Sequence, residues 1–161
     1  DNMGNKRAIE VGEVQVMSAG TGLTHSEFND SKTEAVNFLQ LWIIPEEISV
    51  EPNYEQREFT DEGKKNQLQT VVAPKDKLEA DALPISQQAY IYRTQLEIDK
   101  SIDVSLKSQD NGLYIFVVDG EIEVEGNLLS KRDAIGVYET NQILIKSKEN
   151  SELIIIEVPM S

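Results

Sequence analysis

The chain contains 161 residues, of which 39% are hydrophobic and 27% are charged, the balance of an ordinary folded globular protein. Its formal net charge is −14 at pH 7, and its basic residues form no cluster longer than a pair. Nucleic-acid-binding surfaces need a basic stripe, and anionic membrane surfaces attract basic segments. The composition therefore argues against a nucleic-acid partner and against a membrane partner. No run approaches the ~18 apolar residues of a membrane-spanning helix.

Cysteine is absent from the sequence. Disulfide bonds and thiolate metal ligands are thereby excluded, and a reducing compartment, the cytoplasm, is the expected location. The chain begins Asp1-Asn2-Met3 without an apolar leader. Because a targeting segment would stand in front of Asp1, the first residues of this chain do not tell whether the protein is targeted to another compartment.

Strand-like runs separated by turn residues recur along the chain, and we find no amphipathic pattern long enough for a regular helix. The predicted fold class is therefore all-β. Residues 13–17 form a short run. Residues 36–44, VNFLQLWII, are almost continuously apolar, which predicts a strand that is covered on both faces.

The second half of the chain has the clearer strand pattern. Residues 101–107 alternate between apolar and polar side chains, as expected of a strand with one buried face. Asp119-Gly120 is a dipeptide that favours a two-residue hairpin turn, and the returning strand is expected to point Ile122 and Val124 inward. Further strands are predicted at residues 113–118, 143–146 and 153–158, and a further turn at Gly126-Asn127.

Two polar stretches divide the chain near its middle. Residues 60–67 lack periodicity, and residues 74–86 contain two prolines and many charges, which is typical of connecting structure. We therefore predict a first unit over residues 1–59 and a second over residues 60–161. The second unit holds enough strands to close a small barrel or sandwich. The first holds too few and would leave exposed strand edges, so we expect strands in front of Asp1.

Residues 12–29, GEVQVMSAGTGLTHSEFN, contain the candidate metal ligands. His25 is the single histidine of the chain, and Glu27 would share its face of a strand, because side chains two residues apart point the same way. Gly20 and Gly22 suit a tight turn before that strand. An imidazole and a carboxylate suit Fe, Mn, Co, Ni, Cu or Zn. Taken alone, the pair fits a surface histidine better, and a facial triad would need a second histidine.

The same segment resembles the signature at the end of the first barrel of pirin-like bicupins. The flanking pieces fit as well: DNMGN precedes it, and NFLQLWIIPEE and EPNYEQREF follow it. The resemblance is close over residues 1–59. It weakens from residue 60 on, where VVDGEIEVEG and the closing strands still fit a second barrel.

The second sequence motif of cupins in general is echoed by Gly12, Gly20, His25 and Asn29. Ser18 stands where proline is usual, and two extra residues precede the histidine. Pirin-like proteins have this longer form, so the departure favours the pirin-like family over other cupins.

The resemblance implies a cupin double-stranded β-helix (a jelly-roll barrel) and a bicupin whose first barrel is incomplete in this chain. It also implies a divalent metal, commonly iron, held by three histidines and one glutamate. The third histidine and the glutamate match His25 and Glu27, whereas the other two histidines would precede Asp1. We therefore expect weak metal binding by this chain alone, with Cu, Ni, Mn, Co or Zn as alternatives to Fe, and a second barrel without metal.

Three further residues are candidates for a substrate pocket. Phe38, Gln40 and Trp42 would share one face of the strand predicted at residues 36–44. If that face lines the first barrel, Gln40 would hydrogen-bond a metal-bound water or substrate, and the two aromatic rings would wall an aromatic substrate. In the alternative, Phe38 and Trp42 are core residues and Gln40 bonds the backbone.

Three functions follow from the resemblance. The first is a quercetin 2,3-dioxygenase that opens a flavonol ring with molecular oxygen, with Glu27 as metal ligand and as base toward the flavonol hydroxyl. The second is a metal- or redox-dependent regulator that binds other proteins without being an enzyme. The third is a non-catalytic fragment. In each case we expect the open edges of the first barrel to be covered by an N-terminal segment, a swapped copy or a neighbouring molecule.

Overall fold

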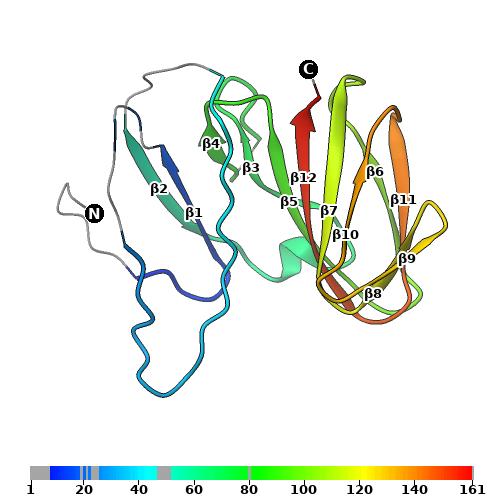
Figure 1. The fold of residues 1–161 in the computed structure, drawn as a ribbon, viewed down its shortest axis with the longest axis horizontal. Helices are drawn as coiled ribbons and strands as arrows, with labels where there is room; N and C mark the ends of the chain where they lie inside the picture. Colours follow the sequence, from blue (N-terminus) through cyan, green and yellow to red (C-terminus); the bar gives the residue numbers. More distant parts are fainter. Residues whose placement is uncertain are drawn as a thin grey trace.

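The computed structural model describes residues 8–18, 20, 22, 26–46, 52–79 and 81–160, and the account below concerns these residues (Figure 1). Almost all of the regular structure in them is strand, which confirms the predicted fold class, and the one helix is the 3-10 turn η1. No helix in the described ranges is long and apolar enough to cross a membrane. The elements are β1 (Glu13–Ser18), β2 (Asn53–Glu58), η1 (Glu62–Lys64), β3 (Gln69–Pro74), β4 (Leu83–Ile85), β5 (Tyr90–Leu96), β6 (Ser101–Ser105), β7 (Asn111–Asp119), β8 (Glu121–Val124), β9 (Asn127–Ser130), β10 (Ala134–Val137), β11 (Gln142–Ser147) and β12 (Ser151–Pro159).

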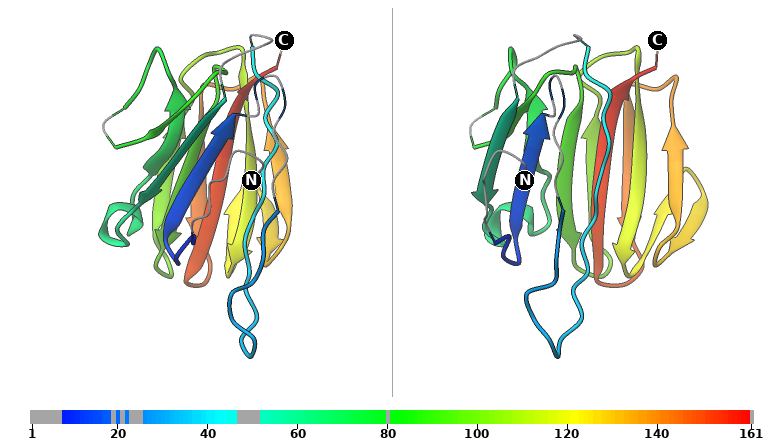
Figure 2. Two further views of the ribbon diagram at one scale, coloured as in Figure 1. Left: turned by 90° about the vertical axis from the view of Figure 1, so that its left-hand side faces the viewer. Right: turned by 60° about the vertical axis from the view of Figure 1, so that its left-hand side comes forward.

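Two of the three sheets form a sandwich in the second half of the chain. The larger sheet has the strand order β10-β7-β12-β5-β3-β4, and the smaller has the order β6-β11-β8-β9. Strands β1 and β2 pair antiparallel in a separate sheet. Figure 2 shows the layers from two sides. The main core lies between the two larger sheets, because it contains Ile115 and Ile155 from one and Ile122 and Ile145 from the other.

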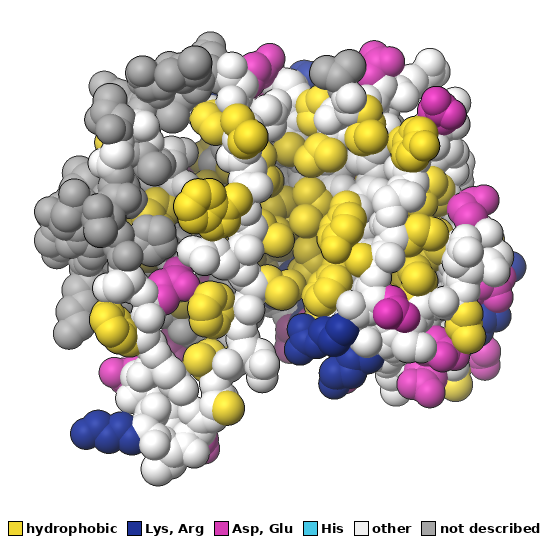
Figure 3. Space-filling model, in the orientation of Figure 1, with side chains coloured by type: hydrophobic (Ala, Val, Ile, Leu, Met, Phe, Trp, Pro, Cys, Tyr) yellow, Lys and Arg dark blue, Asp and Glu magenta, His cyan; other side chains and the backbone are white. Residues whose placement is uncertain are grey.

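Alternation of side chains explains this core. Along β12 the burial alternates residue by residue, and Leu153 and Ile155 are fully buried. Each such side chain stabilises the fold by about 1.5–3 kcal/mol through removal of apolar surface from water. The opposite face of the larger sheet is also apolar: Ile154 and Ile156 are half-buried there. Figure 3 shows hydrophobic side chains gathered on this side of the molecule.

The hairpin predicted at Asp119-Gly120 is wrong. β7 pairs with β10 and β12, whereas β8 pairs with β9 and β11, so the chain crosses from one sheet to the other at Gly120. Gly120 has φ +85, and an added Cβ would lie 2.4 Å from the carbonyl oxygen of Asn150. The two adjacent strands therefore belong to opposite layers. Ile122 and Val124 do point inward as predicted, since both are fully buried.

Two other turn predictions need correction. The hairpin between β8 and β9 turns at Glu125 and Gly126, one residue earlier than predicted, because Val124 pairs with Asn127. Both central residues have positive φ, 49° and 78°, as a type I′ turn requires. The connecting stretch predicted at residues 74–86 contains a short strand, β4, which pairs parallel with β3.

The strand predicted at residues 36–44 is absent from the described structure. This segment is extended but pairs with no strand there, and all of its apolar side chains except Ile43 are exposed, Trp42 by 88% and Ile44 by 84%. It passes in front of the larger sheet (Figure 1). A continuous apolar run predicts burial on both faces, but the described residues supply no cover for it.

Arg93 on β5 connects the small sheet to the sandwich. Its side chain is 7% exposed and donates hydrogen bonds to the carbonyl oxygens of Phe59, Thr60 and Gly12. Its Nε donates to Oε1 of Gln69 at 2.7 Å. Burial lowers the pKa of Arg93 below its ordinary value, although the carboxylates nearby oppose this. The domain boundary at residues 59–60 stays a prediction.

Replacing Ile155 by alanine is expected to lower the free energy of unfolding by about 2–5 kcal/mol, because the cavity lies in a filled core. Chemical denaturation followed by circular dichroism measures this loss. The matched change at Ile98, which is 55% exposed, is expected to cost no more than about 0.5 kcal/mol. Equal losses at both positions would contradict the assigned core.

Replacing Arg93 by methionine is expected to lower the free energy of unfolding by about 2–4 kcal/mol, because buried carbonyl groups lose their donors. Limited proteolysis should then cut first within residues 8–60, before the sandwich is cut. Arg57→Met, at an exposed position of β2, is the matched control. A variant of Arg93 with unchanged stability and cleavage pattern would rule out this role.

Candidate functional site

The predicted metal ligands are only partly visible. Glu27 is exposed and belongs to residues 26–46, which contain no regular element, whereas His25 lies outside the described residues. Across the described residues no three His, Cys, Asp or Glu side chains are grouped to hold a metal ion. The described donors therefore do not form a metal centre by themselves, and the assignment of His25 and Glu27 as ligands stays a prediction.

The part of this segment that is described agrees with a strand followed by a turn. β1 spans Glu13–Ser18 and pairs along its whole length with β2, which sets Ser18 opposite Asn53. Gly20 and Gly22 then have positive φ, 56° and 140°, as expected where a tight turn follows. The small sheet thus fixes where the chain enters the segment that carries His25 and Glu27.

The three predicted pocket residues do not share a strand face, since residues 36–44 form no strand. Phe38, Gln40 and Trp42 are all exposed. Trp42 lies at the edge of a cleft, and Phe38 and Gln40 are not among its lining residues. Their role toward a substrate stays a prediction.

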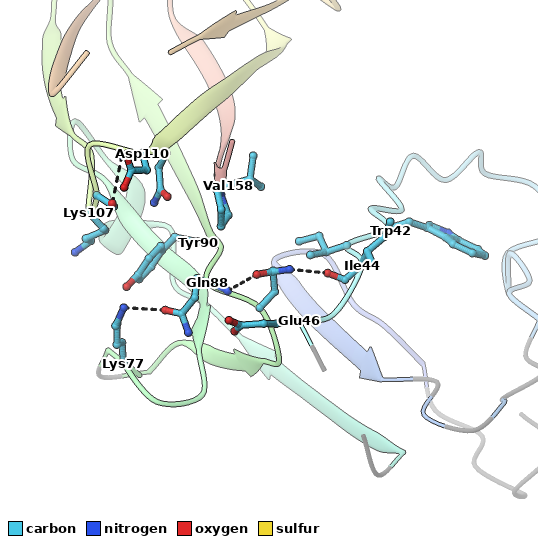
Figure 4. Close-up of a pocket in the computed structure, with 14 residues that line it drawn as sticks. Trp42, Ile44, Glu46, Lys77, Gln88, Tyr90, Lys107, Asp110 and Val158 are labelled. Carbon is cyan, nitrogen blue, oxygen red and sulfur yellow. Dashed lines mark hydrogen bonds between the residues drawn. The ribbon is translucent and has the colours of Figure 1, made fainter. Parts of the chain in front are cut away.

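The cleft occupies about 880 Å³ between residues 42–46 and one end of the sandwich. Figure 4 shows Tyr90, Gln88 and Glu46 close together in it, while the ring of Trp42 points away from them. The other lining residues are Ile43, Ile44, Lys77, Gln87, Lys107, Ser108, Asp110, Asn111, Val158 and Pro159.

A buried carboxylate anchors the sandwich side of this cleft. Glu157 is fully buried and accepts hydrogen bonds from the Tyr92 hydroxyl at 2.9 Å, the Lys107 amide at 2.6 Å and Nδ2 of Asn111 at 2.7 Å. Burial and the neighbouring charge of Glu157 raise the pKa of Tyr92 far above its ordinary value. The burial of Glu157 could have been predicted from the sequence, because side chains two residues apart in a strand share a face and Glu157 therefore shares the buried face of Leu153 and Ile155.

Aromatic residues lie beside this network. Tyr90 and Tyr92 are 5% and 2% exposed, and their rings are stacked with centroids 6.1 Å apart. The Lys107 ammonium lies 5.5 Å from the centroid of the Tyr90 ring and forms an ion pair with Glu79. Burial raises the pKa of Glu79, but hydrogen bonds from Lys107 and Thr70 outweigh it, so the pKa is below its ordinary value.

Two packed, mainly antiparallel sheets, between which the chain crosses repeatedly from β5 to β12, make the second half of the chain a cupin-type jelly roll. Comparison with known proteins agrees. The family model described as the quercetinase C-terminal cupin domain matches residues 70–158, and the pirin model matches residues 1–43. The chain belongs to the pirin family.

Named relatives support this assignment. The chain is 36% identical over 160 residues to the quercetin 2,3-dioxygenase of Escherichia coli K12, which covers 99% of this chain and 66% of that protein. A putative quercetin 2,3-dioxygenase of Zymomonas mobilis is 36% identical over 158 residues, 97% of this chain and 65% of that protein. A crystal structure of the bacterial pirin YhhW from E. coli in complex with nickel(II) superposes with a TM-score of 0.88 at 33% identity, covering 98% of this chain and 66% of that one.

The chain spans just under two thirds of the length of these relatives. The relatives therefore contain about a third of sequence that has no match in this chain. An activity of the complete relatives is only a proposal for this chain.

The ion pair of Glu79 and Lys107 predicts a pH dependence. A lowered pKa of Glu79 in the folded protein means that the stabilisation is full above its unfolded value of about 4.3 and is lost as the pH falls through the folded value. Both side chains are partly exposed, so we expect about 0.5 kcal/mol. Denaturation of the native chain and of Glu79→Gln should differ at pH 7 and converge below pH 4. A difference that grows toward low pH would contradict this sign.

Proposed function

We propose that this chain is part of a metal-dependent pirin-type cupin that opens the ring of a flavonol with molecular oxygen. The observation that carries the proposal is the 36% identity to a quercetin 2,3-dioxygenase over 99% of the chain. In this proposal His25 and Glu27 supply one imidazole and one carboxylate to the metal. The nickel(II) in the solved relative supports a divalent ion, with iron as the family's common choice.

The chain alone does not contain the full ligand set. It has one histidine and no cysteine, whereas a facial triad of nonhaem oxygenases takes two histidines and a carboxylate. The remaining imidazoles must therefore come from outside these 161 residues. Glu27 would serve as ligand and as the base that accepts the proton of the flavonol hydroxyl.

The C-terminal sandwich supports this site and does not hold a metal in our proposal. Its interior is filled with aliphatic side chains such as Ile115 and Ile145. Its buried carboxylate, Glu157, already accepts hydrogen bonds from three donors. A carboxylate engaged in this way stabilises the loop above it, and has little capacity left for an ion.

Joining an N-terminal segment of the E. coli relative to the front of Asp1 should complete the ligand set, because the family resemblance implies that the other two histidines precede this point. The chimera, loaded with iron or nickel, is expected to consume oxygen with quercetin at least about a hundredfold faster than the 161-residue chain, since loss of a mere hydrogen-bond partner of a metal ligand already costs about 10–100-fold in affinity or activity. Oxygen uptake and loss of flavonol absorbance measure this reaction.

Two variants of the chimera complete the experiment. His25→Ala should abolish both metal content and oxygen uptake. Glu58→Gln, at an exposed position of β2, should change neither. A chimera that is folded and metal-loaded but inactive toward quercetin would refute the proposed reaction.

A further inference from the structure

Residues 36–44 are an extended apolar segment that pairs with no strand in the described structure. The segment contains no charged residue, no proline and no glycine, although the chain has a formal net charge of −14. It passes in front of the larger sheet (Figure 1). An uncharged, unpaired segment of this kind is a ready template for pairing with another strand.

Exposure alternates along the segment as it does in a strand. Side chains two residues apart in an extended chain share a face. On one face four apolar side chains are exposed by 55% to 88%: Val36, Phe38, Trp42 and Ile44. On the other face Leu39 and Leu41 are 46% and 44% exposed, and Ile43 is half-buried. The even-numbered face is therefore the one that most needs a cover.

One edge of the segment is bonded to its own chain. The amide of Glu46 donates to the carbonyl oxygen of Ser86 at 2.8 Å, and the carbonyl oxygen of Ile44 accepts a hydrogen bond from Nε2 of Gln87 at 2.9 Å. In an extended chain the main-chain groups of alternate residues point to opposite edges. Those of the odd-numbered residues 37–43 therefore point to the other edge, along which no strand pairs in the described ranges.

The sequence of the segment is nearly symmetric about Gln40. Residues at equal distances from this centre are similar: Leu39 and Leu41, Phe38 and Trp42, Val36 and Ile44. Asn37 and Ile43 are the exception. Two copies that pair antiparallel about Gln40 would therefore set like against like, with an aromatic pair on each side of the centre, which is a stabilising cross-strand contact.

This register also fits the open edge of the segment. When Gln40 lies opposite Gln40 of a second copy without exchanging hydrogen bonds with it, residues 39 and 41 exchange them across the pair, as do residues 37 and 43. All of these are odd-numbered. They are the residues whose main-chain groups point away from the bonds of Ile44 and Glu46.

The exposed apolar surface is large enough for a dimer. Weighted by side-chain size, the six exposures above correspond to about 700 Å² of surface on each copy. Two copies would together bury up to about 1,400 Å², within the roughly 1,200–2,000 Å² that specific interfaces bury.

We propose that residues 36–44 are a dimerisation strand, which pairs antiparallel with the same segment of a second copy about a two-fold axis at Gln40. Because the opposite edge is bonded to the loop before β5, the pairing closes as a dimer and does not extend into a fibre. Dimerisation requires neither a metal nor a substrate, so this proposal and the proposed function can fail independently.

Sedimentation equilibrium tests the association, at an ionic strength that screens the repulsion between two acidic chains. The native chain should pass with rising concentration from 18.1 kDa to twice that mass. Trp42→Glu places a charge opposite Phe38 of the second copy and should weaken dimerisation at least about tenfold. It should leave the fold intact, because Trp42 is almost fully exposed.

The matched control Ile98→Glu changes another exposed apolar residue and should dimerise as the native chain does. A native chain that stays at 18.1 kDa at millimolar concentration would overturn the proposal, and a different molecule or further sequence would then be the cover. A dimer that is equally stable in Trp42→Glu would overturn it as well.

Introduced cysteines test the register, because the chain has none of its own. Cα atoms of a non-hydrogen-bonded antiparallel pair lie about 4.5 Å apart, within the reach of a disulfide bond. Gln40→Cys should therefore form a disulfide-linked dimer on oxidation with diamide. In the control Asn37→Cys the two copies of position 37 would lie six residues apart along the strands, roughly 20 Å, and should not link.

A mixed pair of variants checks the register without changing Gln40. Phe38→Cys and Trp42→Cys should link to each other when mixed, whereas either variant alone should not. Equal cross-linking of Gln40→Cys and Asn37→Cys, or no linkage in the mixture, would overturn the proposal.

Discussion

The buried guanidinium of Arg93 is the contact on which the arrangement of the chain depends. It joins a strand of the sandwich to the carbonyl oxygens of Gly12, Phe59 and Thr60, so it holds the end of the small sheet at which β1 begins and β2 finishes. Arginine suits this position because its planar group presents five donors in a fixed fork. Around it Phe59, Val71 and Leu83 form a second small core, against which Val14 and Val16 pack. The position of β1 rests on this junction.

A second polar centre organises the opposite side of the sandwich. Glu157 is held by donors from β5, from residue 107 and from Asn111, and so it ties the loop above the core to the larger sheet. That loop supplies several residues of the cleft, including Lys107 and Asp110. A buried carboxylate is costly unless its acceptors are satisfied. The buried hydrogen bonds of Glu157 therefore also position Lys107 and Asn111, which line the cleft.

The sequence predicted the positions and buried faces of single strands, which depend on neighbouring residues. It did not predict which strands pair, because that depends on residues far apart in the chain. Alternation was enough to place Ile122, Val124 and the strands near residues 101–107, 143–146 and 153–158, since burial on one face leaves a period of two. Asp119-Gly120 looks like a hairpin locally, yet the strands on either side belong to different sheets, and only their distant partners decide this. The apolar run at residues 36–44 was predicted as a covered strand, but in the described structure it pairs with no strand and most of its apolar side chains are exposed. The pairing of His25 with Glu27 rests on sequence and family resemblance, whereas the cleft at Tyr90 became visible only in three dimensions.

We propose that this chain holds half of a pirin metal site, in His25 and Glu27, and needs side chains from outside these 161 residues to complete it. Titration of nickel(II) into the purified chain, followed by calorimetry, tests this most directly. The account predicts weak binding without a fixed ratio, and the same result for His25→Ala. Tight one-to-one binding that is lost in His25→Ala and in Glu27→Gln would contradict it, because the chain would then hold a complete metal site of its own.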